Sequence, residues 1–344
     1  MKIVNFNKLA VFTLLCTIVF LTACSSEGES VNKEDGENIS IDMSLFYTEN
    51  DAFSQSFTKW TELVEKETEG RIVFNPHYSA SLVSLFDTMD AVRNGSVDAG
   101  VLSAGAISGE IPAMGLLEVL GTFQKEEQFK ASYEDITLLL GDILAKENLK
   151  LLFWSPGSTD VLAIHNKKLL KEVDQFKDMK MRTAGRWQSE QIQRLGASPV
   201  SMDPSELYLA LQNGTVDSTI QAVSLANSQN LYEVTPKMVS LGASSNVIPY
   251  VVNQDIWDKI SPEDQEIIEK VSKQVGEATY SDLGQKEQEA IENMKKEGAE
   301  IYLLTSDEQE AFQKIFRSVY DEIAKTAGED GQKLLEVLKN NEEE

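Results

Sequence analysis

Apolar and polar side chains alternate along Ile39–Asn50, and the segment ends in turn-forming residues, which predicts a first β-strand. The next apolar residues are spaced three or four apart, as on one face of a helix: Phe53, Phe57, Trp60, Leu63 and Val64. Gly70 stands where this helix needs a residue to end it. A strand over Arg71–Tyr78, a helix over Ser81–Gly95 and a short strand over Ser96–Gly105 follow. Such alternation predicts a mainly parallel sheet with helices on both faces.

The same alternation returns in the second half of the chain. Strands are predicted over Lys150–Gly157, Val161–Asn166 and Lys180–Gly185, followed by a helix and a strand within Ser189–Met202. The next helix has a well-formed start, with Asp203 as N-cap, Pro204 in the first position and Glu206 three residues after the cap. Further on, one long amphipathic helix is predicted within Ser261–Ile301 and two more within Thr305–Asn341.

One corner of the predicted fold occurs twice in nearly the same sequence. The segment AVRNGSVDAGV at Ala91–Val101 is matched by ALQNGTVDSTI at Ala210–Ile220. In each segment, a helix must end abruptly and be followed at once by a strand. Gly95 or Gly214 can adopt the left-handed backbone conformation that such a helix end requires. A single helix–glycine–strand corner is common and can arise by coincidence. The similarity of the residues around both corners favours two related lobes. Their strands would emerge at the carboxyl edges of two sheets, where ligands bind.

Composition narrows the choice of partners. The 344 residues suffice for two domains, and 42% of them are hydrophobic, as in an ordinary globular protein. The net charge is −25, from 31 basic and 56 acidic residues. Such a surface repels nucleic acid and anionic lipid headgroups, so neither is an expected partner, and the acidity favours solubility.

The N-terminus has the layout of an export signal. Lys2 and Lys8 precede the apolar run Leu9–Leu21, which is too short for a comfortable membrane span. The residues Leu21-Thr22-Ala23-Cys24 resemble a bacterial lipobox, in which the cysteine becomes the lipid-modified (palmitate-bearing) first residue. A short uncleaved anchor is the alternative. Because the other cysteine, Cys16, lies inside the signal, the mature chain has no disulfide. The polar segment up to residue 38 is predicted to be a flexible tether.

The mature chain from about Ile41 to Leu338 resembles the DctP family, the solute-binding proteins of TRAP transporters. The first-lobe stretch from Lys66 to Val101 carries part of the resemblance. The more specific part is Asp174–Ser218, with its Lys-Met-Arg, its Gly-Ala-Ser-Pro-Val turn and its helix ending in Gly-Thr-Val-Asp. The match continues over Asn230–Lys270 without obvious gaps.

This resemblance implies an α/β protein of two lobes joined by a hinge, like the type II periplasmic binding proteins, with long helices across both lobes. It implies that the lobes close on a small organic acid and deliver it to a TRAP permease. In the family, the arginine at the position of Arg182 forms a bidentate salt bridge with the substrate carboxylate, which suits the planar guanidinium. From the residues alone, a structural ion pair with a nearby acid is an equal alternative.

The chain departs from the family at two places that bear on the ligand. Gln221 stands where many relatives have asparagine, and it still offers both a donor and an acceptor. Some relatives have a second basic residue on the strand before the binding arginine, where this chain has Val161 and Leu162. One cation in place of two favours a monocarboxylate over a dicarboxylate.

The remaining candidates for the pocket lie at predicted strand ends or just after the arginine: Tyr47, Ser103, Trp154, Asn246 and Trp187. Each is also compatible with a place in the core or in a loop. The two histidines, His77 and His165, have no metal-ligand spacing around them, and the sequence contains neither a phosphate-binding glycine loop nor a Gly-x-Ser-x-Gly motif. We therefore expect no metal, no cofactor and no enzyme activity.

These observations divide the chain into a signal peptide (1–23), a tether (24–38), a first lobe (39–160), a second lobe (161–255) and C-terminal helices across both lobes (256–344), with the option that the C-terminal region returns to the first lobe. The prediction is a lipid-anchored binding protein on the extracytoplasmic face of the cell membrane. Two alternatives remain open, an anchored extracellular hydrolase and a ligand sensor for a signalling receptor.

Overall fold

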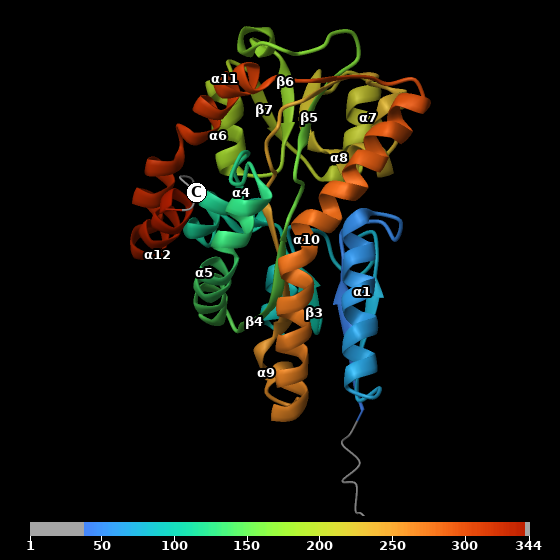
Figure 1. Ribbon diagram of the computed structural model, residues 1–344, viewed down its shortest axis with the longest axis vertical. Coiled ribbons are helices and arrows are strands. Elements are labelled where there is room, and N and C mark those ends of the chain that lie inside the picture. The colour runs from blue at the N-terminus through green and yellow to red at the C-terminus, as the bar shows by residue number, and fades with distance from the viewer. Residues whose placement is uncertain (1–37, 341–344) are drawn as a thin grey trace, which may run out of the picture. The chain divides into compact units, whose positions relative to one another are not determined.

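The computed structural model describes residues 38–340, which belong to one compact unit beginning at Gly36. The signal peptide, the Cys24 lipobox and the tether up to residue 37 lie outside the described residues. Figure 1 shows two β-sheets with helices packed around them. The first sheet has the strand order β2-β1-β3-β10-β4, and the second has the order β11-β9-β5-β8-β6-β7. The predicted α/β class with two lobes is confirmed.

The strands of the first sheet are β1 (Ile39–Ser44), β2 (Ile72–His77), β3 (Ala99–Val101), β4 (Leu149–Pro156) and β10 (Val247–Asn253). Those of the second are β5 (Val161–His165), β6 (Lys180–Thr183), β7 (Ser198–Ser201), β8 (Ser218–Ala222), β9 (Lys237–Ser240) and β11 (Glu300–Leu303).

The α-helices are α1 (Ala52–Glu67), α2 (Thr88–Arg93), α3 (Ala104–Ile107), α4 (Gly115–Glu118), α5 (Glu126–Ala145), α6 (Arg186–Arg194), α7 (Leu207–Gln212), α8 (Val223–Ser228), α9 (Gln254–Trp257), α10 (Pro262–Lys296), α11 (Ser306–Arg317) and α12 (Tyr320–Asn340). Short 3₁₀ turns are η1 (Pro112–Met114), η2 (Val173–Phe176), η3 (Pro204–Glu206) and η4 (Leu231–Glu233).

Each sheet is parallel except for one reversed strand. In the first sheet β10 pairs antiparallel with both β3 and β4, and in the second β5 pairs antiparallel with both β8 and β9. Both reversed strands follow directly in the chain from a strand of the other sheet, β9 and β4 respectively. Each reversed strand enters its sheet from the other lobe, at the end opposite to the one where the remaining strands begin. It therefore runs antiparallel to its neighbours. The two sheets are therefore mixed, which refines the predicted mainly parallel arrangement.

The sheets divide the chain differently from the predicted boundaries. The strand β10, placed by sequence in the second lobe (161–255), belongs to the first sheet, and β11, from the C-terminal region, adds to the edge of the second. The long helix α10 contacts α1 and β4 of the first lobe and α8 and β11 of the second (Figure 1). The local pattern predicted these elements, but the choice of sheet depends on distant pairing partners.

The repeated corner has the same atomic design in both lobes. Gly95 and Gly214 have φ angles of 74° and 76°, in the left-handed region that favours glycine. Before each glycine, an asparagine Oδ1 accepts from the backbone N–H two residues ahead, Asn94 from Ser96 at 3.0 Å and Asn213 from Thr215 at 3.1 Å. Both turns thus satisfy backbone donors at a sharp helix end. The predicted left-handed glycines are confirmed.

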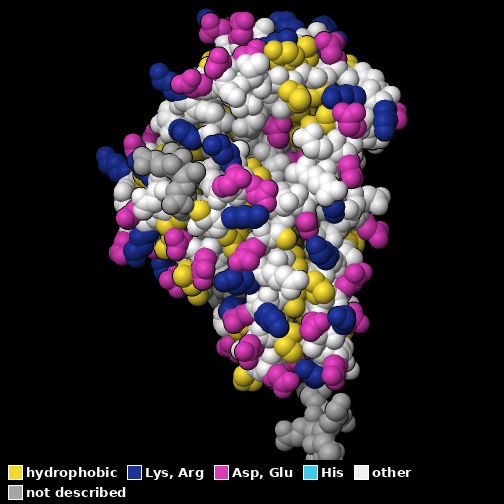
Figure 2. Space-filling model, viewed as in Figure 1, with side chains coloured by type: hydrophobic (Ala, Val, Ile, Leu, Met, Phe, Trp, Pro, Cys, Tyr) yellow, Lys and Arg dark blue, Asp and Glu magenta, His cyan; other side chains and the backbone are white. Residues whose placement is uncertain are grey.

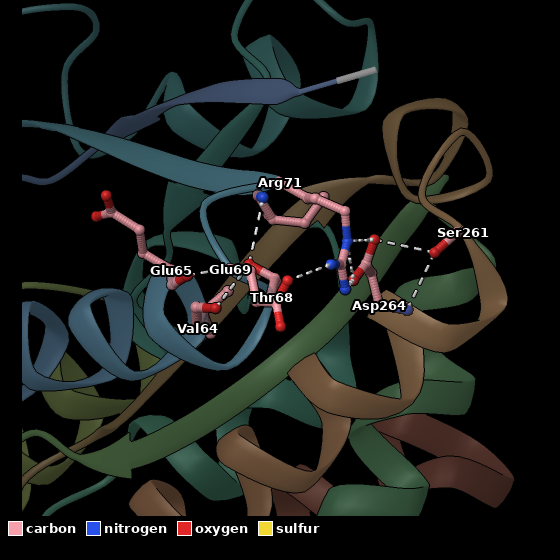
Figure 3. A network of polar contacts seen from close by, with 8 residues as sticks. Val64, Glu65, Thr68, Glu69, Arg71, Ser261 and Asp264 are labelled. Atoms are coloured by element: carbon pink, nitrogen blue, oxygen red, sulfur yellow. Dashed lines mark hydrogen bonds and ion pairs between the residues drawn. The ribbon is translucent and has the colours of Figure 1, made fainter. Parts of the chain in front are cut away.

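The ends of α1 and α10 are joined by a polar network in the first lobe (Figure 3). Arg71, which follows α1, donates through Nη2 to Asp264 Oδ1 at 2.7 Å and through Nε at 3.1 Å. Asp264 lies in the first turn of α10, where Ser261 as N-cap accepts from its backbone N–H at 3.1 Å. This arginine is therefore occupied in holding α10 against the first lobe.

Two short links run directly from a strand of one sheet to a strand of the other within the described residues, and buried carboxyls hold both of them. Glu287 of α10 accepts from the backbone N–H of Thr159 at 3.0 Å and from the hydroxyls of Ser158 and Thr159, in the link from β4 to β5. Asp160 in the same link accepts from the backbone N–H of Gly242 at 2.9 Å, in the link from β9 to β10, and from the Oγ of Ser240, the last residue of β9. The two crossings are therefore tied to each other and to the helix that spans both lobes.

Replacing Glu287 by glutamine is expected to weaken the pH dependence of stability. Burial raises the pKa of Glu287 from its ordinary value of 4.5 to about 8. A carboxyl with a raised pKa in the folded state stabilises the fold fully below its unfolded pKa, and this stabilisation is lost as pH rises through the folded pKa. Between about pH 5.5 and pH 8.5 the wild-type free energy of unfolding should fall by about 3 kcal/mol more than that of the variant. Denaturant unfolding at both pH values measures this, with exposed Glu289→Gln on the same helix as control; equal slopes in all three proteins would contradict it.

Within residues 38–340, no helix combines the length and apolar character that a membrane crossing requires. On the face shown in Figure 2, acidic and basic side chains of the described residues are interspersed. The described part of the chain also contains no cluster of three or more His, Cys, Asp or Glu suited to a metal ion.

Candidate functional site

A cavity lies between the two sheets, at the ends of their strands. Its empty space amounts to about 560 Å³, part of which is open to solvent. The first lobe contributes Phe46, Tyr47, Leu85, Ser103, Gly105, Glu118, Asn246 and Ile248, and the second contributes Arg182, Ala184, Gln188, Pro204, Ile220, Gln221, Ala222 and Leu225. Leu120, Gly157 and Ser245 complete the lining. Five of the seven residues proposed from sequence are thus brought together here, namely Arg182, Gln221, Asn246, Tyr47 and Ser103.

Arg182 lies on β6 with only 4% of its surface exposed. Its Nε and Nη2 both donate to the carbonyl oxygen of Met202 at 3.1 Å. In the described part of the chain, no carboxylate forms an ion pair with this guanidinium. Burial lowers its pKa to about 10, partly offset by Asp203, so it stays charged at neutral pH. Since a guanidinium carries five N–H donors, Arg182 keeps donors for an anion in the cavity.

Other arginines show what a structural role looks like in this protein. Arg93 pairs with Asp90, Glu110 and Glu147, and Arg194 pairs with Glu190 and Glu322. Arg71 pairs with Asp264. These three are neutralised by carboxylates at the surface or partly below it, whereas the more deeply buried Arg182 is not. The structural ion pair considered from the sequence has no partner among the described residues.

Gln221 supplies a second unused donor from the neighbouring strand. It lies on β8 and is 5% exposed. Its Oε1 accepts from the backbone N–H of Ala222 at 3.1 Å, but its buried Nε2 has no hydrogen-bond partner within the described residues. A buried donor without a partner costs about 1–3 kcal/mol, so its presence beside Arg182 favours a ligand that brings acceptors.

The first lobe presents a polar pair and an aromatic face to the same cavity. Asn246, just before β10, donates through Nδ2 to Ser103 Oγ at 2.5 Å, just after β3. Tyr47 follows β1, is 3% exposed and stacks on Phe53 with ring centroids 4.5 Å apart. Burial raises the pKa of the Tyr47 hydroxyl, so it remains a neutral donor and acceptor. The cavity therefore combines a cationic side chain on one lobe with polar and aromatic side chains on the other.

Trp154 and Trp187 do not line this cavity. Trp154 is fully buried between Phe123, Phe129 and Tyr133, and its Nε1 donates to Thr137 Oγ1 at 2.8 Å. Trp187, in the first turn of α6, is 2% exposed and packs in the first-lobe core close to Gly115. Both side chains fill space between helices and strands in the core. The sequence alone was compatible with this role as well as with contact with a ligand.

Sequence reasoning missed Glu118, a lining residue on α4. It is 2% exposed, and burial raises its pKa to about 7. Its carboxylate accepts from Ser108 Oγ and from the backbone N–H of Gln188 at 2.8 Å. A signal was present in the sequence, because Glu118 is the only charged residue within the apolar run Ile111–Phe123.

Comparisons with known proteins show the family of the chain. The family model of the bacterial extracellular solute-binding proteins, family 7, matches residues 43–327. The C4-dicarboxylate-binding protein DctB of Bacillus subtilis is 26% identical over 317 residues, covering 89% of this chain and 88% of that protein.

Two solved structures have a similar fold. DctP7 of Bordetella pertussis, an extracytoplasmic solute receptor binding pyroglutamic acid, aligns with a TM-score of 0.81 at 17% identity over 88% of this chain and 99% of that one. A TRAP periplasmic solute-binding protein of Desulfovibrio salexigens with bound orotic acid aligns with a TM-score of 0.79 at 19% identity over 88% and 98%. At such identities the likeness concerns the fold.

Proposed function

Because the chain belongs to family 7 of the bacterial extracellular solute-binding proteins, we propose that it captures a small organic acid between its lobes and delivers it to a TRAP-type permease. The observation that carries the proposal is Arg182, a buried guanidinium that lines the cavity and has no carboxylate partner among the described residues. A carboxylate matches the planar guanidinium in charge and geometry, and the sheltered site strengthens each hydrogen bond.

The ligand is proposed to be a monocarboxylate that carries a further acceptor. Arg182 is the one basic side chain among the described lining residues, so a single carboxylate has a cationic partner. The unpaired Nε2 of Gln221 suits a carbonyl or hydroxyl oxygen on the same molecule. Pyroglutamic acid, named for the Bordetella structure, has one carboxylate and a ring carbonyl, whereas the Bacillus relative is named for dicarboxylates. The single cation and the unpaired amide donor of this cavity suit a monocarboxylate with a carbonyl better than a dicarboxylate.

A thermal-shift screen of the full chain tests the proposal. Small mono- and dicarboxylates are compared with their uncharged amides, because a ligand that binds only the folded state raises the melting temperature. Monocarboxylates are expected to raise it by several degrees and their amides to leave it unchanged. A shift by neutral analogues as large as that by the acids, or by no acid in protein freed of any co-purified ligand, would contradict the proposal.

Binding is proposed to proceed by closure about the two crossing segments. These links join the sheets at residues 157–160 and 241–246, and α10 spans both lobes. Carboxylate contacts from Arg182 on one lobe and contacts from Asn246, Ser103 and Tyr47 on the other would favour the closed form, which a permease can recognise. The family and the fold are those of substrate-binding receptors, and we propose no catalytic step. The hydrolase alternative has no observation in its favour. The sensor alternative differs only in the protein that receives the closed form.

We further propose that Cys24 anchors the protein to the membrane through lipid. The support is the sequence Leu21-Thr22-Ala23-Cys24 after an apolar run, together with the polar stretch that follows it. Replacing Cys24 by serine is expected to move the protein from the membrane fraction to the soluble extracytoplasmic fraction, because no acyl chain can then be attached. Immunoblots of fractionated cells measure this, with Cys16→Ser as the matched control. Retention of the Cys24→Ser protein on membranes would favour an uncleaved anchor.

A further inference from the structure

Two glutamines in the cavity lining are oriented by the backbone. Gln188 and Gln221 are 9% and 5% exposed, and both line the cavity. Gln188 Oε1 accepts from the backbone N–H of Ala184 at 2.7 Å, and Gln221 Oε1 accepts from the backbone N–H of Ala222 at 3.1 Å. Because a backbone N–H can only donate, these contacts fix which end of each amide is the oxygen. Neither Nε2 group has a hydrogen-bond partner within the described residues.

Both glutamines are attached to the strand that carries the binding arginine. The strand β8, which holds Gln221, pairs with β6 so that Arg182 lies opposite Thr219. Gln188 lies in the first turn of α6, which follows β6 in the chain. The second lobe therefore adds two amide donors to the cation in one wall of the cavity.

The carboxylate and amide oxygens of the other lining residues are already occupied. Glu118 Oε1 accepts from the backbone N–H of Gln188 at 2.8 Å, and Oε2 accepts from Ser108 Oγ. Asn246 Oδ1 accepts from Ser245 Oγ at 3.4 Å. Among the lining residues that the structure describes, no carboxylate or amide oxygen therefore lacks a donor. Apart from hydroxyls, the side-chain groups left for a ligand are N–H donors.

We propose that Gln188 determines specificity together with Gln221: their amide N–H groups bind oxygen acceptors on the body of the ligand, so the protein accepts oxo, hydroxy or lactam acids and rejects acids that carry an ammonium group. This inference rests on the proposed function, because it assumes that Arg182 binds the carboxylate of the ligand.

The balance of donors and acceptors decides which acids fit. A carbonyl oxygen on the ligand gives a buried amide N–H the acceptor that it lacks, and an unpaired buried donor is costly. An ammonium group brings a charge and several donors of its own, and it loses its water on entering the cavity. The hydroxyls of Tyr47 and Ser103 can donate or accept, so a ligand hydroxyl or a neutral lactam N–H also finds a partner.

The carboxyls closest in sequence and space to this wall do not provide a free site for an ammonium group. Both oxygens of Glu118 are bonded to protein donors. Asp203, at the start of η3, is not among the residues that line this cavity, and its Oδ1 accepts from the backbone N–H and the hydroxyl of Ser205 at 2.9 and 2.7 Å.

Three ring acids of similar size test the inference: L-pyroglutamate, cyclopentanecarboxylate and L-proline. Each has one carboxylate, and the rings differ in carrying a lactam, no polar atom or an ammonium group. Titration calorimetry measures their binding to the full chain freed of co-purified ligand, with 2-oxoisovalerate, isovalerate and L-valine as an open-chain series. In both series the oxygen-bearing acid is expected to bind about tenfold more tightly than the plain acid, and the amino acid to bind most weakly.

Gln188→Glu is the decisive variant. Glutamate has nearly the same shape, keeps an oxygen to accept from Ala184 and replaces the Nε2 donor by a second oxygen. The added charge weakens all carboxylates, so the measured quantity is the ratio of the affinities for proline and pyroglutamate. This ratio is expected to rise at least about tenfold, whereas a purely structural role would lower both affinities alike. Gln193→Glu, the same change at an exposed position of α6, is the control and should keep the wild-type ratio.

A second variant avoids the added charge. Gln188→Met removes the donors and is expected to bind pyroglutamate and cyclopentanecarboxylate with nearly equal affinity. Circular dichroism and thermal melting of each variant establish that it is folded before its affinities are compared.

The outcomes separate this inference from the proposed function. If proline binds wild type as tightly as pyroglutamate does, or if folded Gln188→Glu and Gln188→Met keep the wild-type ratios, the inference is overturned. The proposed function then still stands, provided that Arg182→Met abolishes binding. If none of the acids binds wild type, the proposed monocarboxylate function is contradicted, and the inference falls with it.

Discussion

Replacing Arg182 by methionine is expected to abolish high-affinity carboxylate binding without destabilising the ligand-free protein. Arg182 is 4% exposed, and among the described residues its guanidinium donates to the carbonyl oxygen of Met202. Loss of one partner of a buried charged pair costs about 2–5 kcal/mol of binding free energy, a weakening of roughly 30- to several thousand-fold. Lysine at this position should bind poorly as well, because an ammonium group cannot form the planar two-point contact.

The stability of the same variant distinguishes the binding role from a structural one. A structural arginine in an ion pair leaves an uncompensated carboxylate when it is removed, which destabilises the fold. Arg182 has no such carboxylate within residues 38–340, and its burial is itself unfavourable. The melting temperature of Arg182→Met should therefore equal or exceed that of wild type. Arg194→Ala, which removes a carboxylate-paired arginine on α6, is the control and should bind normally. Wild-type affinity in Arg182→Met would remove Arg182 from the site.

Replacing Trp154 by alanine is expected to lower the free energy of unfolding by about 3–5 kcal/mol, as for other large buried aromatic residues. The indole stacks on Tyr133 with ring centroids 4.7 Å apart and lies edge-on to Phe129 at 5.1 Å. Its removal leaves a cavity between α5 and β4 and also frees Thr137 from the 2.8 Å hydrogen bond with the indole N–H. Chemical denaturation monitored by circular dichroism measures the loss.

Binding separates this core role from contact with the ligand. Since Trp154 does not line the cavity, the folded fraction of Trp154→Ala should bind the carboxylate with near wild-type affinity at low temperature. Trp154→Phe keeps a ring in the cluster and should recover most of the stability. If the Trp154→Phe protein were as stable as wild type but no longer bound the carboxylate, Trp154 would have to be counted among the residues that contact the ligand. The same logic applies to Trp187, which is buried in the first-lobe core from the second-lobe helix α6.

Much of the secondary structure follows from the sequence because its causes are local. The spacing of Phe53, Phe57 and Trp60 predicts α1, since it depends only on helical periodicity. Asp203, Ser261 and Thr305 accept from backbone N–H groups at helix starts, as a short polar side chain at that place should. Gly95 and Gly214 take left-handed conformations for an equally local reason.

Part of the site was also predictable from sequence. Arg182 is a charge inside an apolar strand pattern, and such a charge requires a partner whatever the fold. The resemblance to the DctP family pointed to the same residue and to Gln221. The sequence could not show, however, which N–H groups of Arg182 and Gln221 lack a hydrogen-bond partner. That depends on which neighbours approach each side chain.

The sequence by itself thus determined the elements, the repeated corner and the cation that needs an anion, because periodicity, backbone geometry and charge burial act within a few residues. Only the tertiary structure decided that β10 joins the first sheet and β11 the second, that Trp154 belongs to the core, and that Glu118 accepts a hydrogen bond from the first turn of α6. Each of these depends on a contact between segments far apart in the chain; Glu118 and Gln188, for example, are 70 residues apart. Such contacts are selected by packing of the whole molecule, which local patterns do not encode.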